Sequence, residues 1–212
     1  LRNIGSQNEP NFEVVDRDFG GLSTIALDTI LNETVKGIFP TLADLDNDGD
    51  DDMVVGDNNG KIHYFKNNAS AGQDALFELE NVNFFNIDIG QHSAPFLYDM
   101  NDDNLFDLII GQVDGTITYA QNTGTIENPV YNTLIEDFGG ISVNNEESLY
   151  GFSTPFVFKQ DNEINILIGS ESGRIYHYKS VNNDLSVNFE LISDNFQSCL
   201  LYTSDAADDG YR

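Results

Sequence analysis

The feature of this sequence that most restricts its fold is a repeat of about 55 to 60 residues. Three segments align with one another: 39–67, 94–122 and 154–180. Successive copies lie 55 and 60 residues apart at a shared proline, and 55 and 58 residues apart at two shared glycines. These anchors are Pro40, Pro95, Pro155, Gly56, Gly111, Gly169, Gly60, Gly115 and Gly173. Such recurrence predicts one structural unit that is used several times.

A second block also repeats. Residues 3–23 read NIGSQNEPNFEVVDRDFGGLS, and residues 122–142 read NTGTIENPVYNTLIEDFGGIS. The second copy follows directly on the end of one of the longer segments. The chain is therefore expected to begin near the end of one repeat and to run through about three more.

Each repeat has room for four short strands. In the first copy, residues 40–45 alternate as a half-buried strand does, and 52–56 form an apolar run suited to a strand covered on both faces. A turn ending in Asn-Gly then leads into a third strand. Asn-Gly favours a tight hairpin turn, because such turns need residues that adopt positive φ. A fourth strand is expected around Phe77, and in the other copies around Tyr131 and Phe189.

The pattern predicts an all-β protein, a partial β-propeller with about three and a half blades, each a four-stranded antiparallel sheet. The expected units are 1–36 (end of a preceding blade), 37–89, 90–148 and 149–198. A β-sandwich is the competing architecture, but it does not require the same four strands to recur. Residues 22–35 fit either a short helix or an irregular strand. Because propellers close with four to eight blades, the chain is expected to be a fragment of a longer protein.

The last residues, 199–212, differ in character from the repeats. Residues 199–208 read CLLYTSDAAD, which resembles the translated end of a sequencing adapter. This tail is expected to be non-native, with a genuine polar tail as the alternative.

Charge restricts the partners of this chain. There are 36 Asp and Glu against 9 Lys and Arg, a formal net charge of −27. Such a chain is repelled by phosphate backbones and anionic lipid surfaces, so no nucleic-acid partner is expected. No segment approaches the roughly 18 apolar residues of a membrane helix, so membrane insertion is not expected.

The clearest candidate chemistry is an acidic loop, 44–52, which reads DLDNDGDDD. Oxygen ligands at alternate positions of a tight loop suit a hard cation such as Ca²⁺. Gly49 is expected to supply the positive φ of the sharp turn. The predicted ligands are the side chains of Asp44, Asp46, Asp48 and Asp52 and the backbone carbonyl of Asp50.

The second repeat keeps the pattern as DMNDDNLFD at 99–107, with Asn104 in the place of the glycine. One neutral ligand predicts weaker binding, and a surface turn without an ion is the alternative for both loops. The third repeat is two residues shorter and begins with Lys159, so no metal is expected there. An EF-hand is excluded, because its twelfth position needs Glu. The predicted ligands of the second loop are Asp99, Asn101, Asp103, Asp107 and the carbonyl of Leu105.

These residues resemble the FG-GAP/VCBS repeat family, which includes the propeller of integrin α subunits. The resemblance lies in the loop 44–52 followed by a strand ending at Gly56, and in the Ser-x-Pro tripeptides 93–95 and 153–155. It covers residues 3–196 approximately. It implies that a calcium loop joins the first two strands of a blade and makes it rigid. It further implies a secreted or cell-surface protein that serves in adhesion, ligand binding or assembly.

No spacing singles out a nucleophile with its base, and there is no phosphate-binding glycine loop or HExxH pair. The leading prediction is therefore a non-enzymatic, calcium-binding extracellular scaffold for adhesion or for binding a protein or glycan ligand. The alternative is a polysaccharide lyase or hydrolase built on the propeller, and a passive spacer is a third possibility.

Overall fold

The computed structural model describes residues 2–25, 27–28, 33–34, 37–70, 72–144 and 150–196. These residues form three four-stranded antiparallel sheets and two two-stranded ones, which confirms the prediction of an all-β protein. The expected tail 199–212 lies outside the described residues. No helix in the described part of the chain is long and apolar enough to cross a membrane.

Each large sheet is one repeat, with its strands in sequence order. The first sheet contains β5 (Ile38–Ala43), β6 (Asp52–Asp57), β7 (Ile62–Asn67) and β8 (Phe77–Asn81). The second contains β9 (Ala94–Tyr98), β10 (Asp107–Gly111), β11 (Ile117–Ala120) and β12 (Leu134–Ile135). The third contains β13 (Thr154–Gln160), β14 (Glu163–Gly169), β15 (Ile175–Lys179) and β16 (Glu190–Ser193).

The remaining elements are short. β1 (Arg2–Asn3) pairs with β2 (Phe12–Glu13), and β3 (Leu27–Asp28) pairs with β4 (Glu33–Thr34). Three 3₁₀ segments occupy equivalent places in successive repeats: η1 (Phe19–Ile25), η2 (Phe84–Asn86) and η3 (Phe138–Gly140). The ambiguous segment 22–35 therefore contains the end of a 3₁₀ helix and a two-stranded hairpin.

The second strand of a sheet supplies its core. All residues of β6 and β10 are buried, as the apolar runs predict. Successive side chains of a strand point to opposite faces, so Leu108 and Ile110 pack toward the first sheet while Ile109 packs toward the third. One apolar core thus lies between the first and second sheets, and another lies between the second and third.

The junctions between sheets are built alike. The hydroxyl of Ser93, at the entry to β9, accepts from the backbone of Asp57 at 2.8 Å and donates to the carbonyl of Lys61 at 2.6 Å. Ser153, at the entry to β13, makes the same two bonds to Gln112 and Thr116, at 2.8 and 2.6 Å. The Ser-x-Pro tripeptides therefore join each sheet to the next.

A glycine near the end of the second strand in the first two sheets explains how closely each of these sheets approaches the next. A Cβ on Gly56 would lie 2.1 Å from the carbonyl oxygen of Ser93, and one on Gly111 would lie 2.1 Å from that of Ser153. No side chain fits at that distance, so only glycine permits the junction.

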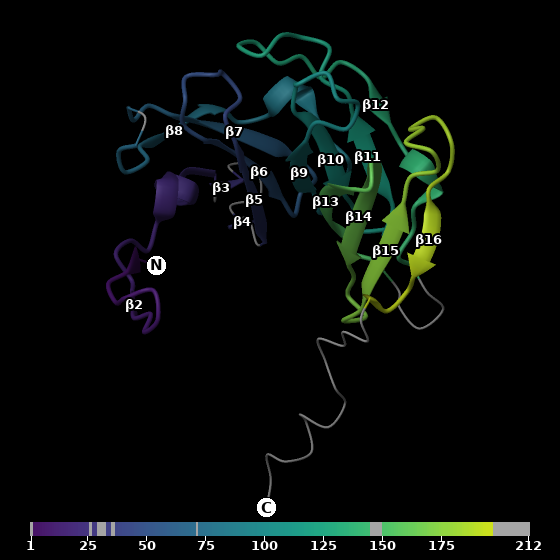
Figure 1. The fold of residues 1–212 in the computed structure, drawn as a ribbon. Coiled ribbons are helices and arrows are strands. Elements are labelled where there is room, and N and C mark those ends of the chain that lie inside the picture. The colour runs from purple at the N-terminus through teal and green to yellow at the C-terminus, as the bar shows by residue number, and fades with distance from the viewer. Residues whose placement is uncertain are drawn as a thin grey trace, which may run out of the picture.

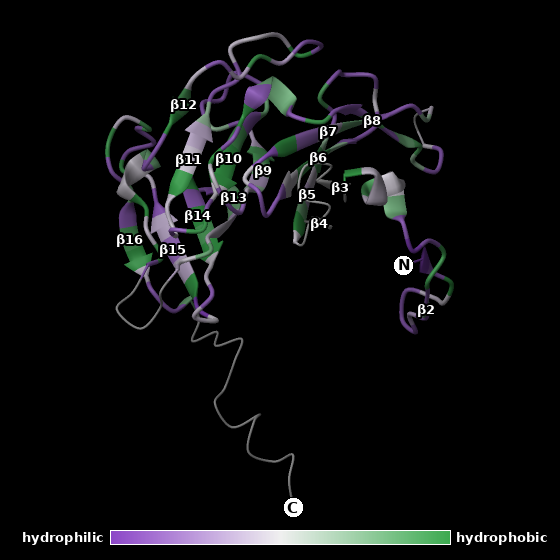
Figure 2. Ribbon diagram, turned by 180° about the vertical axis from the view of Figure 1, so that it is seen from behind, coloured by the Kyte–Doolittle hydropathy of each residue, from purple (hydrophilic) through white to green (hydrophobic). Residues whose placement is uncertain are grey.

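The three sheets follow one another along an open arc (Figure 1), with β9 packed against both β5 and β13. The fourth strands β8, β12 and β16 lie toward the outside of this arc. Figure 2 shows hydrophobic stretches along strands such as β7, β10 and β16. The calcium-loop candidates connect the first strand of a sheet to the second, 44–51 in the first sheet and 99–106 in the second.

Candidate metal centre

Loop 1, residues 44–52, turns through two residues with left-handed backbone. These are Asn47, at φ 59°, and Gly49, at φ 97°. The positive φ predicted for Gly49 is confirmed. The carboxylate of Asp44 accepts from the backbone N–H groups of Asp48 and Gly49, at 3.2 and 3.1 Å, and Asp48 accepts from the N–H of Asp50 at 3.3 Å. These bonds fold the loop around its own acidic side chains.

Three of the predicted ligands converge. The carboxylates of Asp44, Asp46 and Asp48 each offer an oxygen atom, and these atoms lie within 4.8 Å of one another. Oxygen donors gathered in this way are the donor set that hard cations such as Ca²⁺ take. Asp46 also forms an ion pair with Lys66 of β7.

Several carboxylate oxygens in this loop have no hydrogen-bond partner. Both oxygens of Asp50 and one oxygen of Asp46 are buried and unpaired. An unpaired buried carboxylate is costly, so native proteins normally pair it or place it beside a cation. The residues therefore fit a bound cation, and Asp50 offers its side chain there as well as the backbone carbonyl that was predicted.

The electrostatics of Asp50 agree with this crowding. Burial raises the pKa of its carboxyl group above the ordinary value of 3.8, and the nearby charges of Asp48, Asp44 and Asp46 raise it further. Each of these effects disfavours the ionised form in the absence of a counter-charge. A cation at the loop removes this penalty.

Asp52 occupies a different environment from the other predicted ligands. It is fully buried, and its carboxylate accepts from the hydroxyl of Tyr64 at 2.9 Å and from the backbone N–H groups of Asn67 and Leu45 at 2.8 and 3.3 Å. It does not belong to the cluster of Asp44, Asp46 and Asp48. Its observed role is to hold β6, β7 and the start of loop 1 together.

Loop 2, residues 99–107, repeats this skeleton. Asp99 accepts from the N–H groups of Asp103 and Asn104 at 3.1 and 2.8 Å, and Asp103 accepts from Leu105 at 2.9 Å. Asn104 has φ 67°, which confirms the positive φ expected where it replaces glycine. The two loops therefore share one backbone design.

The side chains of loop 2 form different hydrogen bonds from those of loop 1. The amide of Asn101 donates to the carboxylate of Asp103 at 2.9 Å, so these two predicted ligands bond to each other. Leu105 stands where loop 1 has Asp50 and carries no charge. The aspartates of loop 2 do not form a cluster like that of loop 1 within the described residues.

Asp107 matches Asp52. It is fully buried and accepts from the hydroxyl of Tyr119 at 2.9 Å and from the N–H groups of Asn122 and Met100 at 2.7 and 3.2 Å. Burial raises the pKa of both carboxyl groups, although the hydrogen bonds that they accept oppose the shift.

The third repeat has a two-residue turn in place of a loop. Gln160 pairs with Glu163 across Asp161 and Asn162, which have φ 52° and 64°. Asn165 stands in the position of Asp52 and Asp107, and its side-chain oxygen lies 2.8 Å from Nε2 of His177.

Sequence reasoning missed the partners of the buried aspartates, although a signal was present. Tyr64 follows Asp52 by 12 residues, Tyr119 follows Asp107 by 12, and His177 follows Asn165 by 12. A polar side chain at the start of each second strand is thus bonded to the third strand. Lys66, the partner of Asp46, was missed as well. The equivalent residue is Gln121 in the second repeat and Lys179 in the third, where it pairs with Glu163.

The comparisons with known proteins add nothing to this geometry. No family model matches the chain, and no curated protein shows significant similarity to it. What can be said of its function rests on its own residues.

Proposed function

We propose that this chain is part of a calcium-stabilised β-propeller that acts outside the cell as a non-enzymatic scaffold for adhesion or for binding a protein or glycan ligand. The resemblance to FG-GAP/VCBS repeats motivates the cellular location and the binding role. The observation that carries the proposal is the convergence of Asp44, Asp46 and Asp48 beside the unpaired oxygens of Asp50.

The propeller architecture is supported by the way in which the sheets succeed one another. Each repeat is one four-stranded sheet, consecutive sheets enclose an apolar core, and the junction at Ser93 is repeated at Ser153. A structure made of identical junctions continues in the same sense with every added repeat. Further repeats on the same plan would extend the arc toward a ring.

The calcium role is supported by simple electrostatics. Two unit charges at 4 Å repel by about 4 kcal/mol at an effective dielectric constant near 20. Loop 1 holds three carboxylates close together and a fourth, Asp50, unpaired beside them. When bound, a divalent cation would supply the missing counter-charge, and Asp44, Asp46, Asp48 and Asp50 would hold it.

Stabilisation is the expected consequence of ion binding. Calcium sites of extracellular modules have dissociation constants of about 10⁻⁴ to 10⁻³ M. An ion that binds only the folded chain adds about 2.7 kcal/mol when its concentration is a hundred times the dissociation constant. Loop 1 joins β5 to β6, so the ion would stiffen the sheet that presents the surrounding loops to a ligand.

Thermal unfolding in calcium, in magnesium and in excess chelator tests this proposal. Calcium at saturation should raise the midpoint by about 5 to 10 °C in a chain of this size, and magnesium should raise it less. Asp48→Asn should lose most of the shift. Glu136→Gln is the matched control, because Glu136 is exposed and forms no ion pair with any described residue. A midpoint that does not respond to chelator would refute the calcium role.

A further inference from the structure

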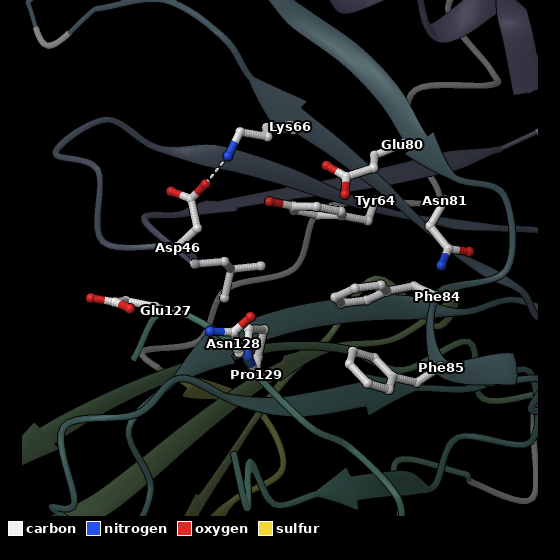
Figure 3. Close-up of a pocket in the computed structure, with 11 residues that line it drawn as sticks. Asp46, Tyr64, Lys66, Glu80, Asn81, Phe84, Phe85, Glu127, Asn128 and Pro129 are labelled. Carbon is white, nitrogen blue, oxygen red and sulfur yellow. Dashed lines mark hydrogen bonds and ion pairs between the residues drawn. The ribbon is translucent and has the colours of Figure 1, made fainter. Parts of the chain in front are cut away.

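A pocket of about 330 Å³ lies beside loop 1, between the first and second sheets. Figure 3 shows Tyr64, Phe84 and Phe85 along one side of it and the segment 127–129 on another. Its volume is at the lower end of the range for small-molecule sites, so it suits one side chain or a ligand of similar size.

The charge of this pocket is negative. Asp46, Glu80 and Glu127 line it together with one cation, Lys66. Lys66 is already paired with Asp46, and neither Glu80 nor Glu127 forms an ion pair with any described residue. Glu80 lies near the Tyr64 ring at the aromatic wall (Figure 3). Two uncompensated carboxylates therefore favour a cationic ligand.

The aromatic wall is apolar but offers little free ring surface. The rings of Tyr64 and Phe84 stack on each other at 4.9 Å, and their exposed fractions are only 8% and 6%. A sugar would need an open ring face to stack on. The wall instead suits an aliphatic stem lying against the edges of the rings.

Phe85 is the unusual residue of this wall. It has φ 53° and ψ 21°, a left-handed conformation that a bulky side chain rarely adopts. Gly20 and Gly139 hold the equivalent position in the neighbouring repeats, at φ 66° and 63°. The left-handed backbone is strained for a non-glycine residue, because its Cβ comes too close to the backbone.

Phe85 packs against the core between the first two sheets, but the equivalent position in the neighbouring repeats has no side chain. The ring of Phe189, which comes from the third repeat, lies directly over Gly139. A Cβ on Gly139 would come within 2.5 Å of this ring. In the middle repeat the corresponding ring, Tyr131, stands edge-on to Phe85 at 5.3 Å. The strained phenylalanine thus adds a pocket wall that the other repeats lack, and strain of this kind concentrates at functional sites.

We propose that this pocket binds the ammonium group of a lysine side chain on a protein partner. The four-carbon stem would lie against Phe85 and Pro129, and the charge would face Glu80 within the field of Glu127. A compact ammonium with three donors suits carboxylates on separate elements better than a planar guanidinium does. The inference rests on the proposed binding role, but it does not depend on calcium.

Titration with two peptides tests the pocket directly. The probes are acetyl-Ala-Lys-Ala-amide and the same peptide with its lysine Nε-acetylated, added to the 212-residue chain in about 1 mM calcium. The charged peptide should cause saturable changes in the NMR signals of Glu80, Phe85 and Glu127. The acetylated peptide should cause none, because it cannot compensate the carboxylates.

Variants then separate the pocket from the diffuse charge of the chain. Glu80→Gln should weaken binding about fivefold and Glu127→Gln about twofold, as expected for partly exposed ion pairs. Phe85→Gly should also weaken it, and this variant should fold, because glycine holds the same backbone conformation in the neighbouring repeats. Glu136→Gln, the same charge change outside the pocket, should leave the affinity unchanged.

Three results would overturn the inference: equal binding of the acetylated peptide, an equal loss in Glu136→Gln, or unchanged binding in Glu80→Gln. Lysine binding without any calcium effect on unfolding would remove the calcium role but keep the pocket. Calcium stabilisation without lysine binding would overturn the pocket but keep the calcium role.

Discussion

Loops 1 and 2 have the same backbone but different electrostatics. Asp44 and Asp99 each accept two backbone N–H groups, and each loop turns through two left-handed residues. Loop 1 nevertheless leaves the oxygens of Asp50 unpaired, whereas in loop 2 Asn101 donates to Asp103. The comparison teaches that two loops with one backbone skeleton can differ in how many carboxylate oxygens lack a partner, and we expect this number to decide how strongly each loop binds an ion.

The lysines near the two loops differ as well. Lys66 comes from the same sheet as loop 1 and pairs with Asp46, a member of the acidic cluster. Lys159 comes from the next sheet, and its Nζ lies 2.6 Å from the carboxylate of Asp102, which is not a predicted ligand. An ion at loop 1 would therefore share Asp46 with Lys66, whereas the lysine at loop 2 pairs with a residue outside the predicted ligand set.

The largest expected effect concerns what the loops share. Asp52→Ala and Asp107→Ala each remove the acceptor of a tyrosine hydroxyl and two backbone N–H groups. Each should lower the free energy of unfolding by about 3 to 5 kcal/mol in chelator, because buried donors are left unpaired. Urea unfolding measures both. Losses that differ by more than about 2 kcal/mol would break the equivalence of the loops.

A substitution in loop 2 should make it resemble loop 1. Asn101→Asp replaces the neutral ligand with a carboxylate and removes the bond from the amide to Asp103. Calcium affinity of loop 2 should rise about tenfold, while stability in chelator should fall slightly through repulsion. Calorimetry in an Asp48→Asn background isolates this site. No gain in affinity would mean that charge does not set the difference between the loops.

The pH dependence of stability should also distinguish the loops. The folded-state pKa of Asp50 is raised above 3.8, so the folded chain holds this proton more tightly than the unfolded chain. Stability in chelator should therefore fall as pH rises from about 3.9 through the raised pKa. Asp50→Leu, which copies Leu105, should flatten this part of the profile. In calcium the wild-type trend should reverse, because ion binding requires ionised carboxylates. Melting curves between pH 4 and 7 measure both trends. Identical pH profiles for the wild-type chain and the Asp50→Leu variant would count against the role of Asp50.

The smallest effect is expected at Lys159. Its pair with Asp102 is partly exposed, at 24% of the Lys159 side chain and 57% of the Asp102 side chain, so Lys159→Met should cost at most about 1 kcal/mol, and less in high salt. Calcium binding should not change, because Asp102 lies outside the predicted ligand set. Urea unfolding at two salt concentrations measures the cost. A loss above about 2 kcal/mol would show that this pair organises loop 2.

Much of this architecture could be predicted from the sequence because repetition makes the signals reinforce one another. The buried runs of β6 and β10, the hairpin turns, and the positive φ at Gly49 and Asn104 follow from local rules of periodicity and turn chemistry. The segment 22–35, which contains the end of η1, could not be assigned, because its apolar spacing fits more than one structure.

The details of the site depend on tertiary contacts that spacing does not encode. Asp52 follows the ligand pattern, yet its oxygens face Tyr64 and the backbone of β7, because the second strand buries its first residue. Asp50 was predicted to contribute only its carbonyl, whereas its side chain is the unpaired group. The sequence did not predict that Phe85 lines a pocket. Its equivalence to Gly20 and Gly139, which have the same left-handed backbone, is seen in the folded chain.

The most direct test of the central claim is a calorimetric calcium titration of the wild-type chain, Asp48→Asn and Asp103→Asn. We expect one tighter site, weakened at least tenfold by Asp48→Asn and unchanged by Asp103→Asn. Of the two loops, only loop 1 has buried carboxylate oxygens without a hydrogen-bond partner among the described residues. Wild-type binding that persists unchanged in Asp48→Asn, or no heat of binding up to about 10 mM calcium, would contradict the account.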